Sequence, residues 1–396
     1  MGRIAKTRRQ AAPGNGHGAE LLRYFQQQQE PMLATLRDLV TQESPSYNKS
    51  AVDRLGGHIA GRLEALEGKV TLHRRQDFGD HIEAQFAGPN SAKPVLLLGH
   101  YDTVWDVGTL AEMPFKVENG RLWGPGVFDM KAGIMLMMQA IEGLRAVRGG
   151  LPRPVTVLLV SDEEVGSNSS RQLTEALARK SQAVFVLEPA TGPQGAVKTW
   201  RKGVGEYKVK VTGKAAHAGI EVREGASAIV ELARQIARIQ TFLDFRRGIT
   251  VNVGVIRGGT RTNVVAAQAS ADVDVRVRKM SDAPRLEKKF RSLKPYDRRC
   301  TLEIDGGVNR PPMERSEGVV KLYRLAQDVA RSMNMELEES GTGGGSDGNF
   351  TAALGVPTLD GLGGVGEGAH ARHENIVLDR LPGRAALIAG LIEAVQ

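Results

Sequence analysis

Three short apolar runs constrain the fold of this chain more than any other feature of its sequence. They are PVLLLGH at 94–100, VTVLLVS at 155–161 and AVFVLEP at 183–189. Each has the length of a strand and lacks polar alternation, which is typical of strands buried on both faces. A helical pattern at 131–147, with Met and Leu at core spacing, separates the first two runs. Apolar strands that alternate with helices predict an α/β sheet covered by helices on both faces.

The pattern changes in the middle of the chain, where alternating strands appear. We expect strands at 205–213, 248–256, 264–278 and 300–305, with helices at 226–239 and 283–293. This β-α-β-β-α-β order is typical of a ferredoxin-like unit. The α/β pattern then resumes with a helix at 318–333, a strand at 356–361 and a terminal helix at 379–395. The ferredoxin-like unit is therefore predicted to be an insertion.

The length of 396 residues exceeds one ordinary core, so two domains are expected. The first is predicted to be discontinuous, over 21–202 and 307–396, and the inserted domain covers 203–306. Residues 1–20 are basic and read as a disordered tail. They lack the apolar core of a signal peptide, so a cytoplasmic location is expected unless an incorrect start site hides an export signal.

Composition excludes several classes of protein. The 53 basic and 45 acidic residues give a net charge of +8, but the basic residues are scattered and no nucleic-acid-binding motif accompanies them. The charge agrees equally well with a surface that attracts small acidic substrates and with no functional meaning. The single cysteine, Cys300, excludes an intrachain disulfide and a cysteine-based zinc site. No run reaches the roughly 18 apolar residues of a membrane span.

Potential metal ligands follow the predicted strands of the first domain. They are His100 and Asp102, Asp129, Glu163 and Glu164, Glu188, and His370 and His373. Ligands collect at the carboxyl ends of strands in open α/β sheets, so these side chains are expected to meet. Nitrogen and oxygen donors without sulfur suit zinc, manganese or cobalt. A bridging carboxylate would hold two ions about 3.5–4 Å apart.

Two motifs have plainer interpretations. The adjacent acids of SDEEVGS could complement the dipole of a following helix. Beside a metal, however, one glutamate can bind the ion while its neighbour takes a proton from the attacking water. GLGGVG at 361–366 matches the dinucleotide fingerprint, but too little chain follows it to complete the required βαβ unit.

Seven motifs occur in an order that is familiar: HYDT, GPGVFDMKAG, SDEEVGS, LEPA, AAHAG, GGTRTNVV and AHARHEN. Together they resemble the di-zinc metallopeptidase family of glutamate carboxypeptidase, aminoacylase, succinyl-diaminopimelate desuccinylase and carnosinase, over about residues 30–395. The resemblance is strongest to the glutamate carboxypeptidase branch. It implies a zinc-hydrolase catalytic domain, two zinc ions per subunit (with manganese or cobalt as alternatives) and an inserted domain that acts as a lid and dimerises.

The resemblance also implies roles for single residues. His100 and Glu188 would hold one zinc, Glu164 and His370 the other, and Asp129 would bridge them. Asp102 would hydrogen-bond His100 and fix its ring. Glu163 would be the general base. His370 is preferred to His373 because relatives place this histidine four residues before a glutamate, here Glu374. Met130 stands where many relatives have another acid.

The inserted domain would complete the site. His217 would stabilise the oxyanion, often from the partner subunit in relatives, while Asn263 and Arg276 would bind the substrate's carboxylate or carbonyl. The loop 341–350, with Gly344, would offer backbone amides to that carboxylate. Plainer alternatives are a loop residue for His217, a turn former for Asn263 and an exposed strand residue for Arg276.

The implied activity is zinc-dependent hydrolysis of an amide bond that releases a glutamate-like amino acid from a small peptide or N-acyl conjugate with a free carboxylate. The alternatives are an N-acyl-amino-acid deacylase with the same metal chemistry and, remotely, a non-catalytic binding protein. A homodimer through the inserted domain is expected.

Overall fold

The computed structural model describes residues 17–89 and 91–395, which form two compact units. The first unit contains the described residues up to Thr199, together with Arg315–Gly341 and the residues from Ser346 onward. The second contains Trp200–Glu314 and Thr342–Gly345. Residues 200–202, 307–314 and 342–345, which the sequence pattern placed in the first domain, thus lie in the second unit, partly because its last strand is longer than predicted.

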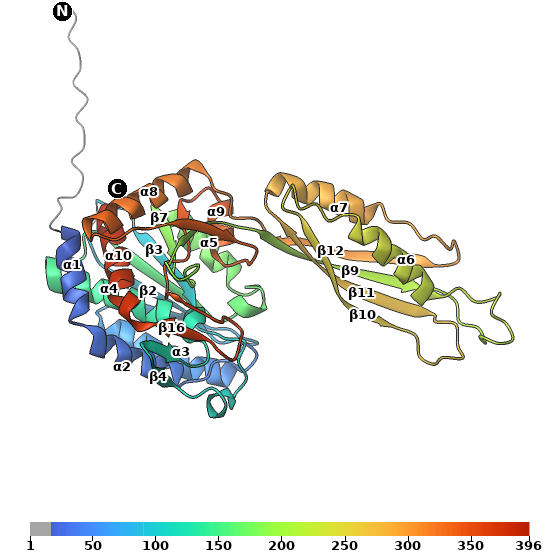
Figure 1. The fold of residues 1–396 in the computed structure, drawn as a ribbon, viewed down its shortest axis with the longest axis horizontal. Helices are drawn as coiled ribbons and strands as arrows, with labels where there is room; N and C mark the ends of the chain where they lie inside the picture. The colour runs from blue at the N-terminus through green and yellow to red at the C-terminus, as the bar shows by residue number, and fades with distance from the viewer. Residues whose placement is uncertain (1–16, 90, 396) are drawn as a thin grey trace, which may run out of the picture. The chain divides into compact units, whose positions relative to one another are not determined.

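The first unit is built on a mixed six-stranded sheet (Figure 1). Its strand order is β1 (Lys69–His73), β2 (His81–Phe86), β6 (Val155–Val160), β3 (Val95–His100), β7 (Ala183–Val186) and β14 (Thr358–Leu359). The last four strands are mutually parallel, whereas β1 and β2 pair antiparallel. The three apolar runs are therefore adjacent central strands, and the predicted α/β class is confirmed.

Helices cover both faces of this sheet. One face carries α1 (His17–Gln26), α2 (Gln29–Val40), α3 (Lys49–Ala65), α4 (Ala132–Arg148), α8 (Glu317–Ser332) and α10 (Leu381–Ala394). The other carries α5 (Arg171–Lys180) and α9 (Gly348–Ala353). Within β3, Leu97 packs into the first core, while Leu96 and Leu98 pack into the second. This two-residue period explains why the central strands carry no polar alternation.

The start of α1 corrects the predicted tail. Residues 1–16 of that tail lie outside the described part of the chain, but His17–Glu20 begin a helix. Leu21 and Phe25 of the same helix are fully buried. Arg148 of α4 binds the His17 carbonyl at 3.0 Å and the Glu20 carboxylate at 2.6 Å, which fixes this first turn.

A small antiparallel sheet that was not predicted holds the C-terminal loop of the first unit. Its order is β15 (Gly366–Glu367), β16 (Asn375–Val377), β5 (Arg121–Trp123) and β4 (Lys116–Glu118). The segment between β15 and β16 carries His370, and β5 leads into the glycine-rich turn before α4. The sheet thus brings together two loops that lie about 250 residues apart in sequence.

The second unit has a four-stranded antiparallel sheet. Its elements in chain order are β9 (Gly203–Thr212), α6 (Ala228–Gln240), β10 (Thr250–Gly258), β11 (Gln268–Val277), α7 (Ala283–Arg291) and β12 (Thr301–Arg310). The strand order β10-β11-β9-β12 is that of a ferredoxin-like unit. Both helices pack on one face, where Tyr207 stacks on Phe290 with ring centroids 3.9 Å apart. This leaves β10 and β12 as edge strands.

A two-stranded sheet of β8 (Val197–Arg201) and β13 (Glu339–Thr342) contains two of the points where the chain passes from one unit to the other, after Thr199 and after Gly341. Within the described residues, no helix has both the length and the apolarity needed to cross a membrane.

Candidate metal centre

The parallel strands deliver four side chains to one edge of the first unit's sheet. His100 is the last residue of β3, and Glu188 follows β7 by two residues. Glu163 and Glu164 form a single 3-10 turn, Glu163–Val165, directly after β6. Because β6, β3 and β7 are parallel neighbours, their carboxyl ends lie side by side.

Asp129 and His370 reach this edge from loops. Asp129 lies in the irregular segment Val127–Lys131 before α4, and its peptide bond to Met130 is cis. Met130 is fully buried, with its sulfur 3.3 Å from the amide nitrogen of His100. His370 has a left-handed backbone, with φ of 60°. A non-glycine residue rarely adopts this conformation unless surrounding contacts hold it, so the loop around His370 is conformationally constrained.

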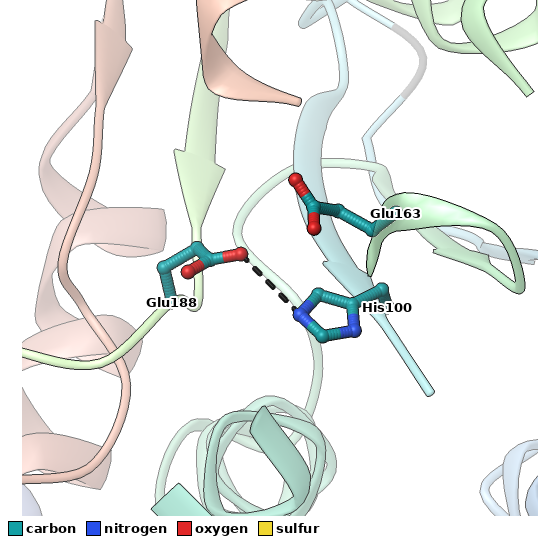
Figure 2. Close-up of side chains that lie close together, drawn as sticks. All are labelled: His100, Glu163 and Glu188. Atoms are coloured by element: carbon teal, nitrogen blue, oxygen red, sulfur yellow. Dashed lines mark ion pairs between the residues drawn. The ribbon is translucent and has the colours of Figure 1, made fainter. Parts of the chain in front are cut away.

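The cluster has two halves that share one carboxylate. His100 Nε2 lies 3.1 Å from Asp129 Oδ1 and 3.4 Å from Glu188 Oε1. His370 Nε2 lies 3.5 Å from Asp129 Oδ2 and 3.1 Å from Glu164 Oε2. Asp129 therefore faces a different histidine with each oxygen. Figure 2 shows the Glu163 carboxylate turned toward the same space as His100 and Glu188, and ligand atoms of these three residues lie within 4.8 Å of one another.

Electrostatics show that this arrangement needs positive charge. Burial raises the pKa of Glu164 to about 7. Burial would also raise the pKa of Asp129, but hydrogen bonds from His100 and His370 outweigh it and hold that pKa below its usual range. Hydrogen bonds to Asp129 and Glu164 in turn raise the pKa of His370 to about 10. The carboxylates thus favour positive charge among them, which divalent cations supply.

The donor set fits a pair of such ions. Each half offers one imidazole nitrogen, one oxygen of the shared Asp129 and one carboxylate that the other half does not use. That carboxylate is Glu188 in the His100 half and Glu164 in the His370 half. Imidazole and carboxylate donors are the usual ligands of catalytic zinc. Among the described residues, ligand atoms lie within 4.8 Å of one another in two triads, His100 with Glu163 and Glu188, and His100 with Asp129 and Glu164. His370 adjoins the second triad through Asp129 and Glu164.

Asp102 contacts the turn with Glu163 and Glu164 as well as the His100 ring, which was the only contact expected from the sequence. Its backbone oxygen lies 3.0 Å from His100 Nδ1, and its Oδ1 lies 3.4 Å from the same nitrogen. Its carboxylate also accepts hydrogen bonds from the amides of Glu163 (3.3 Å) and Glu164 (3.2 Å) and from Ser46 Oγ (2.7 Å). Asp102 thus positions both the His100 ring and the turn with the two glutamates.

The structure distinguishes the two C-terminal histidines. His370 contacts Asp129 and Glu164, whereas the exposed ring of His373 makes no hydrogen bond or ion pair to any residue that the structure describes. In the sequence, Glu374 served only to choose between His370 and His373, and the hydrogen bonds that Glu374 accepts were not predicted. Both of its oxygens accept backbone hydrogen bonds from the segment that carries Asp129. Its spacing from His370 is the only signal of this in the sequence.

The candidate substrate residues all lie in the second unit, in two groups. His217 pairs with Val264, and the Ala218 amide donates to the Asn263 carbonyl at 3.0 Å, so His217 and Asn263 are neighbours. Arg276 Nε and Nη2 bind the Asp274 carboxylate at 2.8–3.0 Å. Its Nη1 lies 3.5 Å from the Gly343 carbonyl.

Gly344 lies in the same loop as Gly343. Its amide donates to Thr342 Oγ1 at 3.2 Å, and its carbonyl lies 3.4 Å from Arg201 Nη1. The amide proposed for a substrate carboxylate is therefore bound within its own loop in this structure.

The group of His217 and Asn263 and the group of Arg276 and Gly344 lie at opposite ends of the paired strands β9 and β11. Arg276 pairs with Val204 at one end of β9, and Gln268 pairs with Thr212 at the other. Eight residues of antiparallel strand span about 27 Å. The pairing of Gly213 with Ala267 and of His217 with Val264 continues beyond Thr212, so His217 is at least that far from Arg276 along the ladder.

A mixed α/β sheet with a two-histidine, multi-carboxylate cluster at the carboxyl ends of its strands defines a class, the metal-dependent hydrolases of peptide and amide bonds. The model of peptidase family M20/M25/M40 matches residues 96–394, and the chain belongs to this family. The family resemblance read from the motifs is thereby confirmed, and the chain is a metal-dependent peptidase or amidohydrolase.

The chain is 29% identical to carboxypeptidase G2 of Pseudomonas sp. (strain RS-16), covering 92% of this chain and 89% of the relative. It is 27% identical to the succinyl-diaminopimelate desuccinylase of Azoarcus sp. (strain BH72), covering 88% and 93%. The crystal structure of an M20 family metallo-carboxypeptidase from Sulfolobus solfataricus shares the fold, with a TM-score of 0.72 at 18% identity over 92% of this chain and 99% of that one.

Proposed function

We propose that this protein is a two-metal carboxypeptidase that hydrolyses an amide bond to release a glutamate-like amino acid from a small peptide or N-acyl conjugate. The observation that carries the proposal is the placement of Asp129, whose two oxygens face two histidines that each have a second carboxylate. Similarity to carboxypeptidase G2 over most of both chains supports the carboxypeptidase assignment.

His100, Glu188 and Asp129 would hold one ion, and Glu164, His370 and Asp129 the other. Zinc is the first candidate, with manganese or cobalt as alternatives; such ions polarise a carbonyl and lower the pKa of water. Glu163 is proposed as the general base that takes the proton from the attacking water and passes it to the leaving amine. Its amide hydrogen bond to Asp102 and its carboxylate near His100 and Glu188 support this role.

The second unit is proposed to bind the substrate and to cover the site as a lid. His217 would donate to the developing oxyanion, and Asn263 would orient the substrate. Basic residues around Arg276 outnumber the one carboxylate, Asp274, that it binds, which supports an acidic substrate: Arg276 and Arg310 pair with the same residue, Val204, from opposite sides. Burial, Arg276 and Arg278 together lower the pKa of the neighbouring Lys202. The Gly344 loop would border this carboxylate site.

A substrate panel tests the proposed function. The chelated protein is supplied with zinc, manganese or cobalt, and amino-acid release is measured from N-acyl and folate-like conjugates. We expect metal-dependent release confined to glutamate and aspartate conjugates, because Arg276 and its cationic neighbours favour an acidic product. Release of many different acylated amino acids would instead identify an N-acyl-amino-acid deacylase, and no release with any metal would contradict both.

A homodimer through the second unit is part of the proposal. Apolar side chains are exposed on the neighbouring α6 and edge strand β10, namely Ile229, Val230, Val255 and Ile256, at 42–64% of their surface. His217 and Arg276 of one chain lie about 27 Å or more apart along the ladder, whereas a dipeptide spans only about 7 Å. If both residues contact one small substrate, one of them must therefore come from a second copy.

Mixing two inactive variants tests this arrangement. We expect Glu163→Gln and His217→Ala dimers, each nearly inactive alone, to regain about a quarter of wild-type activity after subunit exchange. In mixed dimers, one site then combines an intact Glu163 with an intact His217 from the partner. Activity is followed during exchange, with a Glu163→Gln and Glu163→Ala mixture as the matched control. No recovery despite demonstrated exchange would show that His217 acts within its own chain.

A further inference from the structure

The Glu374 side chain is buried, at 1% exposure, and both of its oxygens are fully used. Oε1 accepts hydrogen bonds from the amides of Phe128 (2.9 Å) and Asp129 (3.0 Å). Oε2 accepts from the amide of Gly126 (2.9 Å) and from Trp105 Nε1 (2.7 Å). A carboxylate has about four acceptor positions, and here each has a donor.

These donors come from segments that carry the metal centre. Gly126, Phe128 and Asp129 form the turn that presents the shared carboxylate. Trp105 belongs to the loop that follows His100 and Asp102. Glu374 itself follows His370 by four residues, and its own amide donates to the Ala371 carbonyl at 2.9 Å. One buried side chain therefore joins the loops of Asp129 and His370 to the loop after β3.

The carboxylate is suited to this task in a way that an amide is not. Converging backbone N–H groups form an anion-binding concavity, which a negative group with acceptors on both oxygens satisfies. A glutamine would turn an NH₂ group toward at least one of the same donors. The contact would then be repulsive, and a buried donor would lose its partner.

The two halves of the metal centre depend on Glu374 to different extents. His100 and Glu188 are attached to the ends of neighbouring strands of the central sheet, which Glu374 does not touch. His370 and Asp129 are carried by loops that the pairing of β16 with β5 brings together and that the Glu374 side chain joins directly. Asp129 belongs to both halves, so loss of this contact should affect both. It should affect the His370 half more, because His100 and Glu188 stay fixed at the strand ends while His370 and Asp129 both lose a support.

We propose that Glu374 is a positioning residue that fixes the distance between His370 and Asp129, and thereby the affinity of the metal site formed by Glu164, His370 and Asp129. The proposal rests on the ligand sets of the proposed function. It goes further because it predicts unequal effects on the two sites from a residue that touches neither ion.

The test is metal binding to the chelated full-length protein, by competition of Zn²⁺ with a chromophoric chelator. In Glu374→Gln we expect one equivalent to bind about 10- to 100-fold more weakly and the other to weaken by clearly less, because only Asp129 of its three ligands depends on Glu374. Trp105→Phe removes one of the four donors without changing the backbone and should weaken the same equivalent by less. Glu367→Gln is the matched control, because Glu367 lies on the same small sheet but pairs with Arg121 at the surface.

The possible outcomes test the role of Glu374 separately from the two-metal centre. Equal weakening of both equivalents in Trp105→Phe and Glu374→Gln, or wild-type affinity in both, would overturn the role of Glu374. If Glu374→Gln fails to fold by circular dichroism, the Trp105→Phe isotherm alone decides between unequal and equal weakening. Failure of the wild-type protein to bind two equivalents would instead overturn the two-metal centre itself.

Discussion

Replacement of Glu163 by glutamine is expected to lower kcat by about 10²- to 10⁴-fold while both metal ions stay bound. Glutamine has the shape of glutamate but cannot accept the proton of the attacking water. The hydrogen bond from the amide of residue 163 to Asp102 does not involve the side chain and should persist. Turnover of a glutamate conjugate and metal content by mass spectrometry are measured on the same sample.

The neighbouring residue provides the matched control. Glu164→Gln changes the same chemical group one position along, but it removes the negative charge and one of the two oxygens that lie 3.1–3.2 Å from His370. We expect this variant to lose metal affinity as well as activity, whereas Glu163→Gln loses activity alone. Wild-type turnover in Glu163→Gln, with metal bound, would disprove its assignment as the general base.

Replacement of Asp129 by asparagine is expected to weaken the binding of both ions by more than about 100-fold, which is the upper range for residues outside the ligand shell. Asparagine offers one carbonyl oxygen, so it cannot present an acceptor to His100 and to His370 at once. The backbone amide of residue 129 can still donate to Glu374, so the turn should remain. Equilibrium dialysis with Zn²⁺ and the residual activity measure the effect.

Asp106→Asn, an exposed position in the nearby loop after β3, is the control for the loss of one negative charge and should bind metal as wild type does. A selective loss of only one ion in Asp129→Asn would mean that Asp129 belongs to a single site. Retention of both ions would contradict the bridging assignment altogether.

The sequence already contained much of the first unit. The runs at 95–100, 155–160 and 183–186 are almost entirely apolar because both of their faces are buried, and this pattern distinguishes them from half-exposed strands. Strands β1 and β2 were not predicted, although KVTLH and HIEAQF both alternate polar and apolar residues. Both are short, and in β2 even the polar His81 and Glu83 are buried, so the alternation does not separate a buried from an exposed face. Their position depends on the antiparallel pairing of β2 with β6, a contact distant in sequence.

The sequence predicted which kinds of side chain form the site and at which edge of the sheet they meet. Histidine and acidic residues at strand ends must gather at one edge of a parallel sheet, because the chain direction of each strand determines where it ends. Which of two similar residues takes part was not predictable in this way. His370 and His373 lie only three residues apart in the sequence. The loop between β15 and β16 places His370 beside Asp129 and leaves His373 exposed.

By itself, therefore, the amino-acid sequence determined the fold class, the β-α-β-β-α-β order of the second unit and the set of side chains available to metal. These follow from local periodicity and chain direction. Only the tertiary structure decided that Asp102 holds the glutamate turn, that Asp274 occupies Arg276 and that Glu374 joins the ligand loops. Hydrogen bonds between distant segments depend on where the backbone brings their donors and acceptors, and no local pattern of residues records that.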